Sequence, residues 1–167
     1  MANAWTPGGG FPYCRAQEEQ LSHRTDGRLR MLLAWYAGLY PITPGTAHII
    51  PNVALLRGGH SEGFERIPTP QIFTMISAAA RRYRDECQAR ENPRLLEELC
   101  GLWRAIFTAA REAQVQHLII SAIGAGAFRN PVEEVGEALS LVLKTHDFGT
   151  ELLLITMAVV DDHNSTR

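Results

Sequence analysis

Apolar segments of two lengths alternate through the second half of the chain. Residues 95–114 carry apolar side chains at a 3.6-residue spacing, which predicts an amphipathic helix. The continuously apolar run at 117–123 is typical of a parallel strand covered on both faces. A further helix is predicted over about 131–146, and buried strands are predicted at 72–79 and 151–160. The order β-α-β-α-β predicts a doubly wound or three-layer α/β domain.

The first half is predicted to mix helices, a strand and loops. A helix is expected to begin near residue 15 or 16, with acidic residues in its first turns that suit the helix dipole. A second helix is expected over 29–39, and a β-branched, apolar strand over 48–56. The glycine-containing segment 58–63 reads as a loop, and the polar segment 81–92 as a helix that begins by Ala80.

Composition excludes several classes of protein. The chain has 167 residues, which favours one domain, and its net charge of −2 gives no basic field for nucleic acid or anionic membranes. No apolar run has the length of a membrane span, and no signal peptide is evident. Three widely spaced cysteines fit neither a disulfide framework nor a zinc pattern. We therefore expect a cytoplasmic or nuclear protein, a monomer that binds neither membrane nor nucleic acid.

Glycines follow the predicted strand at 117–123. Gly124 and Gly126 would let backbone N–H groups form a cup, and the helix beginning near Pro131 would add its positive end. Such a site suits a diphosphate at the carboxyl edge of a sheet. It is not a phosphate-binding Walker loop, and Arg129 stands where a dinucleotide fingerprint needs glycine. A tight turn that requires small residues is an equally supported interpretation.

A second glycine-rich segment lies near two adjacent acids. Gly8, Gly9 and Gly10 would let a backbone approach a phosphate or ribose, and Glu18 and Glu19 follow eight residues later. Two neighbouring, partly buried carboxylates repel each other, which favours a proton on one of them. That protonated state is the one needed to protonate a glycosidic oxygen. Alone, however, the glycines read as a flexible tail and the acids as a solvated helix start.

Other candidate residues carry weaker signals. Phe128 could pack on a ribose, although for an isolated phenylalanine the core is favoured. Cys14 has no histidine placed beside it by the sequence, so a nucleophilic role is disfavoured. The segment 161–163, Asp-Asp-His, could bind a metal, but a solvated strand exit is favoured. Arg81, Arg82 and Arg84 read as a helix face balanced by nearby acids.

The two glycine motifs together resemble the poly(ADP-ribose) glycohydrolase family in its short microbial form. The first is Pro-Gly-Gly-Gly at 7–10, then six residues and Gln-Glu-Glu at 17–19; the second is Gly-Ala-Gly-Ala-Phe at 124–128 followed by Asn130-Pro131. Weaker similarities occur at 2–4, 52–57 and 76–80, so the resemblance runs from residue 2 to about residue 164.

The resemblance implies a macrodomain-like, three-layer α/β/α fold with a mixed sheet between helices. Family members carry further structure before the segment that matches residues 2–4. We therefore expect residues 1–167 to form a single catalytic domain that is N-terminally short and lacks one or more N-terminal strands.

The resemblance also implies roles for individual residues. Glu19 would be the catalytic acid and base, and Glu18 would hold the ribose hydroxyls and help position the scissile bond. The implied substrate-binding residues are Asn3, Gly8, Gly9, Gly10, Gln17, Gly124, Ala125, Gly126, Ala127 and Phe128. The glycines at 8–10 would line the catalytic loop, residues 124–127 would cradle the diphosphate, and Asn3 and Phe128 would contact the distal ribose.

The implied activity is hydrolysis of ribose–ribose O-glycosidic bonds in poly(ADP-ribose), on modified proteins, with release of ADP-ribose. Carboxylate acid–base chemistry needs no cofactor and no metal, and we expect none. Two alternatives remain: an ADP-ribose-binding macrodomain without turnover, and a hydrolase of mono-ADP-ribosyl proteins. A degenerate fragment that neither binds nor cleaves is a further possibility.

Overall fold

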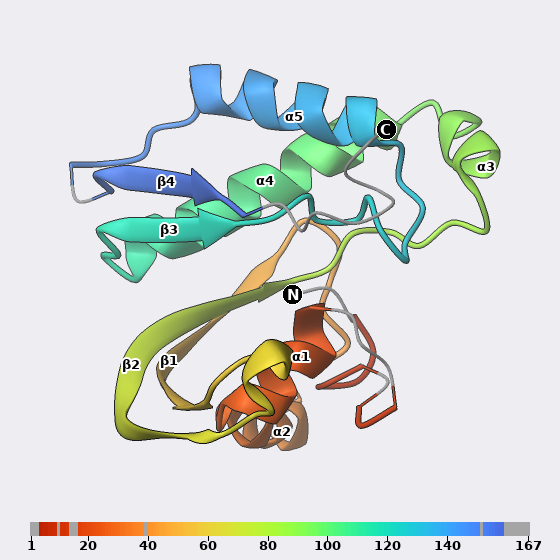
Figure 1. Cartoon of the computed structure of the whole chain (residues 1–167). Coiled ribbons are helices and arrows are strands. Elements are labelled where there is room, and N and C mark those ends of the chain that lie inside the picture. The colour runs from red at the N-terminus through yellow and green to blue at the C-terminus, as the bar shows by residue number, and fades with distance from the viewer. Residues whose placement is uncertain (1–3, 10, 14–16, 39, 151, 159–167) are drawn as a thin grey trace.

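The structure is a computed structural model that describes residues 4–9, 11–13, 17–38, 40–150 and 152–158. A long antiparallel hairpin connects two groups of elements (Figure 1). Helices α1 and α2 lie beside the hairpin near its turn, and α4, α5 and a small parallel sheet lie at its other end.

The hairpin consists of β1 (Ala47–Arg57) and β2 (Arg66–Ala78), with the short helix η1 (His60–Glu62) between them. Its register pairs Ala47 with Ala78 and shifts between Ile50 and Val53. The register shift spans Pro51 and Asn52, and Asn52 has the left-handed φ of 57°. The strand predicted over 48–56 is therefore confirmed, with the proline accommodated at an irregular point of the ladder.

Two helices cover one part of the hairpin. Helix α1 (Gln17–Arg24) begins where the sequence predicts, and α2 (Gly27–Tyr36) corresponds to the helix predicted over 29–39. Asp26 lies between them, and its Oδ1 accepts a 2.7 Å hydrogen bond from the N–H of Ala54 in β1. A small core lies between α2 and the hairpin, formed by Met31, Ile50, Val53 and Met75.

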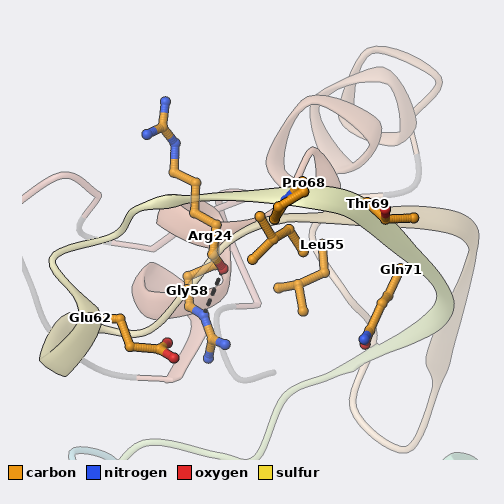
Figure 2. A pocket seen from close by; sticks show the side chains of 9 residues that line it. Arg24, Leu55, Gly58, Glu62, Pro68, Thr69 and Gln71 are labelled. Carbon is orange, nitrogen blue, oxygen red and sulfur yellow. Dashed lines mark hydrogen bonds between the residues drawn. The ribbon is translucent and has the colours of Figure 1, made fainter.

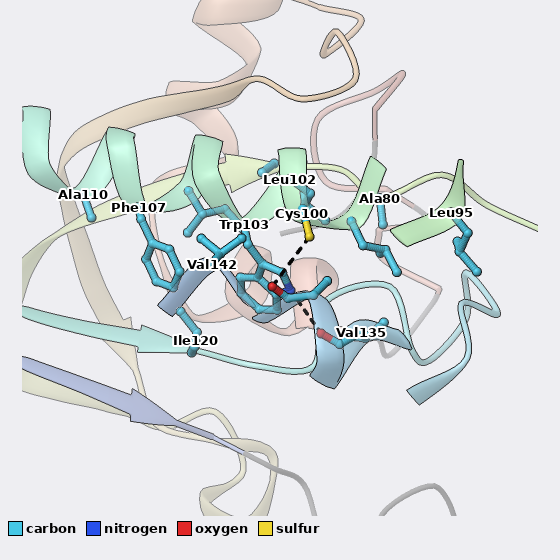
Figure 3. Close-up of a cluster of buried hydrophobic side chains, with 14 of the residues drawn as sticks. Ala80, Leu95, Cys100, Leu102, Trp103, Phe107, Ala110, Ile120, Val135 and Val142 are labelled. Atoms are coloured by element: carbon cyan, nitrogen blue, oxygen red, sulfur yellow. Dashed lines mark hydrogen bonds between the residues drawn. The ribbon is translucent and has the colours of Figure 1, made fainter. Parts of the chain in front are cut away.

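The larger core surrounds helix α4 (Leu95–Glu112). Figure 3 shows Trp103 and Phe107 of α4, whose rings stack at 6.0 Å between centroids, with Ile120 nearby. The Trp103 indole N–H donates a 3.3 Å hydrogen bond to the carbonyl of Val135 in α5 (Val132–Thr145). This bond satisfies the one polar atom of a fully buried ring. The helices predicted over 95–114 and about 131–146 are both confirmed.

The parallel sheet is smaller and more exposed than predicted. Strand β3 (His117–Ile120) pairs with β4 (Leu154–Met157), whose side chains are largely exposed. Ile119 is 65% exposed, so the expectation of a strand covered on both faces is wrong. The strand predicted at 72–79 belongs to the longer β2, and its residue Ile72 is 62% exposed.

Two further expectations are corrected. Within 81–92 only α3 (Glu86–Arg90) is helical, and residues 79–83 have no regular secondary structure. The described residues form two separate two-stranded sheets, one antiparallel and one parallel, in place of one mixed sheet. The chain is thus a small α/β domain with helices and small sheets. Among the described residues, no helix is both long and apolar enough to cross a membrane.

Candidate functional site

The adjacent acids at the start of α1 are both buried. Glu18 is 4% exposed and Glu19 is 6% exposed, although they occupy the first turn of an eight-residue helix. Glutamate is almost never this buried unless its carboxylate is engaged, because desolvation of a charge is costly. The expectation of a solvated helix start is therefore excluded for this pair.

The first glycine loop is bound to this helix. The backbone N–H of Gly8 donates a buried 2.8 Å hydrogen bond to Oε1 of Glu18. Gly8 and Gly9 have φ values of +82° and +53°, in the left-handed region that favours glycine. A Cβ at Gly8 would lie 2.9 Å from Nε of Arg28, so the loop also fits closely against α2. Residues 7–9 therefore form a turn that is held against α1 and α2, and the interpretation as a flexible tail is excluded for them.

Three candidates near the N-terminus lie outside the described residues. These are Asn3, Gly10 and Cys14. The possible metal-binding segment 161–163 lies outside them too. Among the residues that the structure does describe, no cluster of histidine, cysteine and acidic side chains could hold a metal ion.

The second glycine loop follows β3 and leads into α5. Gly124 has a φ of +91°, and a Cβ there would lie 2.8 Å from the Cβ of Ala80. The N–H groups of Gly124, Gly126, Ala127 and Phe128 have no hydrogen-bond acceptor within the described parts of the chain. Such a series of unused amides is the feature expected of an anion-binding loop. The N–H of Ala125 is already used, because it donates to the carbonyl of Ala122 at 3.1 Å.

Asn130 holds the second loop in this shape. It is 1% exposed, and its amide nitrogen donates to the carbonyls of Arg81 at 2.9 Å and Gly124 at 3.1 Å. The N–H of Tyr83 also donates to the carbonyl of Phe128 at 2.9 Å. These bonds attach the loop to the segment that follows β2. The sequence motif includes Asn130-Pro131, but the motif alone assigns no role to Asn130. The structure shows that its side chain holds the loop in place.

A direct contact joins the two motifs. The Ser121 hydroxyl donates a 3.2 Å hydrogen bond to Oε1 of Gln17, across 104 residues of sequence. Ser121 directly follows β3 and precedes the second glycine loop, and Gln17 begins α1, so this bond joins the last part of the first motif to the start of the second. The tertiary structure therefore brings into contact the two segments that the sequence singled out.

Phe128 lies at the boundary between the second loop and the core. Its side chain is half-buried and packs against the cluster around α4. The core interpretation of this residue is therefore confirmed, while a contact with a ribose stays a prediction.

Tyr40 was missed by the sequence reasoning. It is 7% exposed, and its hydroxyl lies 3.4 Å from the hydroxyl of Ser77, which is fully buried at the end of β2. Burial raises the pKa of the Tyr40 phenol; the hydrogen bond with Ser77 opposes this rise, and the negative charge of Glu18 adds to it. Tyr40 thus lies within electrostatic reach of Glu18 as a neutral hydroxyl. A tyrosine that precedes a proline carries no sequence signal for this position.

A separate hollow lies on the hairpin. Figure 2 shows this pocket of about 470 Å³, lined among others by Arg24, Leu55, Glu62 and Gln71. The side chain of Arg24 donates a 3.4 Å hydrogen bond to the carbonyl of Arg57 there. No residue of either glycine loop lines this hollow, so we do not assign the chemistry of the motifs to it.

Comparisons with known proteins support the fold that the motifs imply. No protein-family model matches the sequence, and no curated protein matches it. The α/β fold that contains the buried carboxylate pair and the two glycine loops is nevertheless similar to that of solved protein structures. The structure is similar to poly(ADP-ribose) glycohydrolase from Deinococcus radiodurans in complex with ADP-ribose, with a TM-score of 0.78 and 24% identity, over 97% of this chain and 67% of that chain.

Two structures from Thermomonospora curvata give the same result. Poly(ADP-ribose) glycohydrolase from this organism has a TM-score of 0.79 at 24% identity, over 97% of this chain and 61% of that one. Its complex with the inhibitor ADP-HPD has a TM-score of 0.74 at 22% identity, over 98% and 64%. The chain therefore has the fold of short microbial poly(ADP-ribose) glycohydrolases, and it spans 61–67% of the length of these structures.

Proposed function

We propose that this protein hydrolyses ADP-ribose glycosidic bonds, and specifically the ribose–ribose O-glycosidic bonds of poly(ADP-ribose), releasing ADP-ribose. The observation that carries the proposal is the hydrogen bond between Ser121 and Gln17, which joins the two glycine motifs beside a buried carboxylate pair. A diphosphate site and an acid–base group within one small region are what this substrate requires. The solved structures of the same fold support the proposal, because one of them is a poly(ADP-ribose) glycohydrolase in complex with ADP-ribose.

Glu19 is the proposed acid and base. Cleavage of the bond requires a proton on the leaving ribose oxygen and stabilisation of an oxocarbenium-like centre. Glu19 would donate that proton and then accept one from the attacking water. Its burial at 6% exposure supports this role, since a site shielded from bulk water strengthens the interactions of a carboxyl group with a bound substrate.

Glu18 is proposed to hold the ribose hydroxyls and position the scissile bond. One of its oxygens fixes Gly8, so the carboxylate would set the distance between the glycine loop and the sugar. On the other side, the unused N–H groups at 124 and 126–128 would bind the diphosphate. Residues 1–167 are proposed to act as one macrodomain-like catalytic domain with a three-layer arrangement, in which Asn3, Gly9, Gly10 and Gln17 would line the same site.

The test is a hydrolysis assay with poly(ADP-ribose) and detection of free ADP-ribose. Glu19→Gln keeps the size of the side chain but removes the acid, so it is expected to abolish turnover while ADP-ribose binding persists. Glu97→Gln is the matched control, because Glu97 also lies in the first turn of a helix but its side chain is 67% exposed. The control should retain full activity.

Other outcomes discriminate between the functions. Undiminished turnover in Glu19→Gln would contradict the role of this residue. Tight ADP-ribose binding by the wild type without any product from polymer or from mono-ADP-ribosyl protein would indicate a binding module. A wild-type melting temperature that ADP-ribose does not raise would argue against the whole proposal, because a ligand of the folded state must stabilise it.

A further inference from the structure

The hollow on the hairpin in Figure 2 lies apart from both glycine loops and has no part in the proposed hydrolysis. It continues the face of the β1–β2 hairpin that α2 covers: Val53 belongs to the small core, and Leu55, two residues further along β1, lines the hollow. Gln71, the partner of Leu55 in the ladder, lines it too. Its volume of about 470 Å³ is larger than a single ion needs and lies within the range of small-molecule sites.

Two arginines give this hollow its positive charge. Arg24, the last residue of α1, donates from Nε to the carbonyl of Arg57 at 3.4 Å, and Arg57 donates from Nη1 to the carbonyl of Phe64 at 3.3 Å. Neither guanidinium group takes part in an ion pair within the described part of the chain. Each group is therefore held by one backbone carbonyl and keeps further N–H donors for an anion.

The presence of two arginines discriminates between anions. One guanidinium group is enough for a carboxylate, which it binds through two parallel hydrogen bonds. A phosphate monoester has three terminal acceptor oxygens and a charge of about −1.5 to −2 at neutral pH, so it can bind two guanidinium groups at once. The pair formed by Arg24 and Arg57 therefore favours a phosphate monoester over a carboxylate.

An acidic side chain belongs to the same lining. Oε2 of Glu62 accepts a hydrogen bond from the N–H of Gly59, and a Cβ at Gly58 would lie 2.6 Å from that oxygen, so this glycine makes room for the carboxylate. Among the described residues, Glu62 has no cationic partner. Its charge opposes the binding of a bare phosphate ion, whereas its oxygens can accept hydrogen bonds from hydroxyl groups. The lining therefore favours a ligand that carries hydroxyl groups beside its phosphate.

Neutral side chains complete the lining. Thr69 and Gln71 of β2 offer a hydroxyl and an amide group, and Leu55, Ile67 and Pro68 supply an apolar surface. A sugar ring has hydroxyl groups at its edge and C–H groups on its faces. Both kinds of surface in the hollow therefore have a counterpart on a sugar.

We propose that this hollow is a binding site for a small sugar phosphate. The phosphate would bind Arg24 and Arg57, and Glu62 would accept hydrogen bonds from the sugar hydroxyl groups. The inference goes beyond the proposed function and does not rest on it, because no residue of either glycine loop lines the hollow. A bound ligand would link the end of α1 to the end of β1, so it should raise the melting temperature.

The test is isothermal titration calorimetry at fixed ionic strength with glucose 6-phosphate and ribose 5-phosphate. Inorganic phosphate and the two unphosphorylated sugars are the comparison ligands. At least one sugar phosphate should bind about tenfold more tightly than inorganic phosphate and than either free sugar, because only it uses both parts of the lining. The combination of Arg24→Gln with Arg57→Gln should weaken that binding by at least about tenfold. The preferred sugar phosphate distinguishes a hexose from a pentose ligand.

Glu62→Gln separates hydrogen bonding to the sugar from a general effect of charge. The amide oxygen of glutamine can still accept the bond from Gly59, but the negative charge is removed. Inorganic phosphate should therefore bind this variant more tightly, while the advantage of the sugar phosphate over phosphate should shrink by about threefold, because a neutral acceptor binds hydroxyl groups less strongly. A purely electrostatic effect would raise both affinities equally, and an unchanged ratio would overturn the proposed sugar contact.

Arg66→Gln is the matched control, because Arg66 is an exposed arginine of β2 that does not line the hollow, and it should change each affinity by less than about twofold. Undiminished binding in the double arginine variant would overturn the inference, because the ligand would then bind elsewhere. Inorganic phosphate that binds as tightly as both sugar phosphates would also overturn it, as would no binding at all. Urea midpoints check that the variants fold, and Glu62→Gln decides if the double variant does not. None of these outcomes bears on the proposed hydrolysis, which is tested separately with Glu19→Gln.

Discussion

The backbone N–H of Gly8 donates a buried 2.8 Å hydrogen bond to the Glu18 carboxylate. The residues are separated by ten positions, and the bond closes the first glycine loop on the start of α1. A carboxylate that is 4% exposed thereby gains a partner, and a turn with a left-handed backbone gains an anchor. Loop and helix consequently act as one unit.

We expect Glu18→Ala to destabilise this unit more than Glu18→Gln. Alanine leaves the N–H of Gly8 buried without its acceptor, which costs about 1–3 kcal/mol, whereas the glutamine carbonyl can still accept the bond. The measurement is the free energy of unfolding in urea for both variants. Equal stability of the two variants would contradict the anchoring role.

The two glycines of the second loop should respond differently to alanine. Gly124→Ala places a Cβ 2.8 Å from Ala80 and requires a φ of +91°, so we expect a loss of about 1–3 kcal/mol. Gly126→Ala meets no atom within 4 Å and needs no left-handed backbone, so its stability should stay within about 0.5 kcal/mol of the wild type. Both are measured by chemical denaturation. A neutral Gly124→Ala would contradict the close packing of loop and strand end.

The contact between the two motifs can be measured by a double-mutant cycle. Ser121→Ala and Gln17→Ala each remove one partner of the 3.2 Å hydrogen bond. The bond is exposed, so we expect a coupling of about 0.5 kcal/mol in the free energy of unfolding. Additive effects of the two substitutions would indicate that the contact does not hold the motifs together in solution.

Trp103→Ala should destabilise the main core severely. The indole is fully buried, stacks on Phe107 and donates to the carbonyl of Val135. Loss of a buried aromatic side chain costs about 3–5 kcal/mol. Trp35→Ala is the control, because this ring is 43% exposed on α2, and it should cost far less. Thermal and urea denaturation measure both.

His146 should make the protein sensitive to mild acid. Burial lowers the pKa of His146 from its ordinary value of 6.5; Arg111 lowers it further, Asp147 opposes this, and Arg104 adds a smaller decrease. The unfolded chain thus binds this proton more readily than the folded chain. The stability that depends on neutral His146 is present above pH 6.5 and is lost as pH falls through the folded value.

The measurement is the urea midpoint between about pH 8 and about pH 5.5. His146→Gln should flatten this pH dependence, because its side chain does not titrate. His117→Gln, at an exposed histidine of β3, should keep the wild-type profile. If the urea midpoint of His146→Gln depends on pH as strongly as that of the wild type, the acid sensitivity comes from other groups.

Periodicity identified the helices well and the strands less well. The apolar spacing at 95–114 corresponds to α4, because the buried face of an amphipathic helix appears in the sequence as apolar residues at a 3.6-residue spacing. The proline at 131 corresponds to the start of α5. The apolar run at 117–123 predicted a buried strand, yet β3 ends at Ile120 and exposes Ile119. Whether both faces of a strand are covered depends on what packs there, which the run itself does not encode.

The segment around Arg81 shows the same limit. Its polar composition predicted a helix, but the backbone near it binds the second glycine loop, through the carbonyl of Arg81 and the N–H of Tyr83. These long-range hydrogen bonds replace the local ones that a helix would use. Local propensity was overridden by tertiary contacts.

The sequence by itself determined the chemistry: which glycines can take left-handed turns, where two carboxylates stand together, and which helices present an apolar face. Only the tertiary structure decided that Glu18 and Glu19 are buried, that Tyr40 lies within electrostatic reach of Glu18, and that Ser121 meets Gln17 across 104 residues. The physical reason is that burial and long-range hydrogen bonds depend on which distant segments the fold brings together.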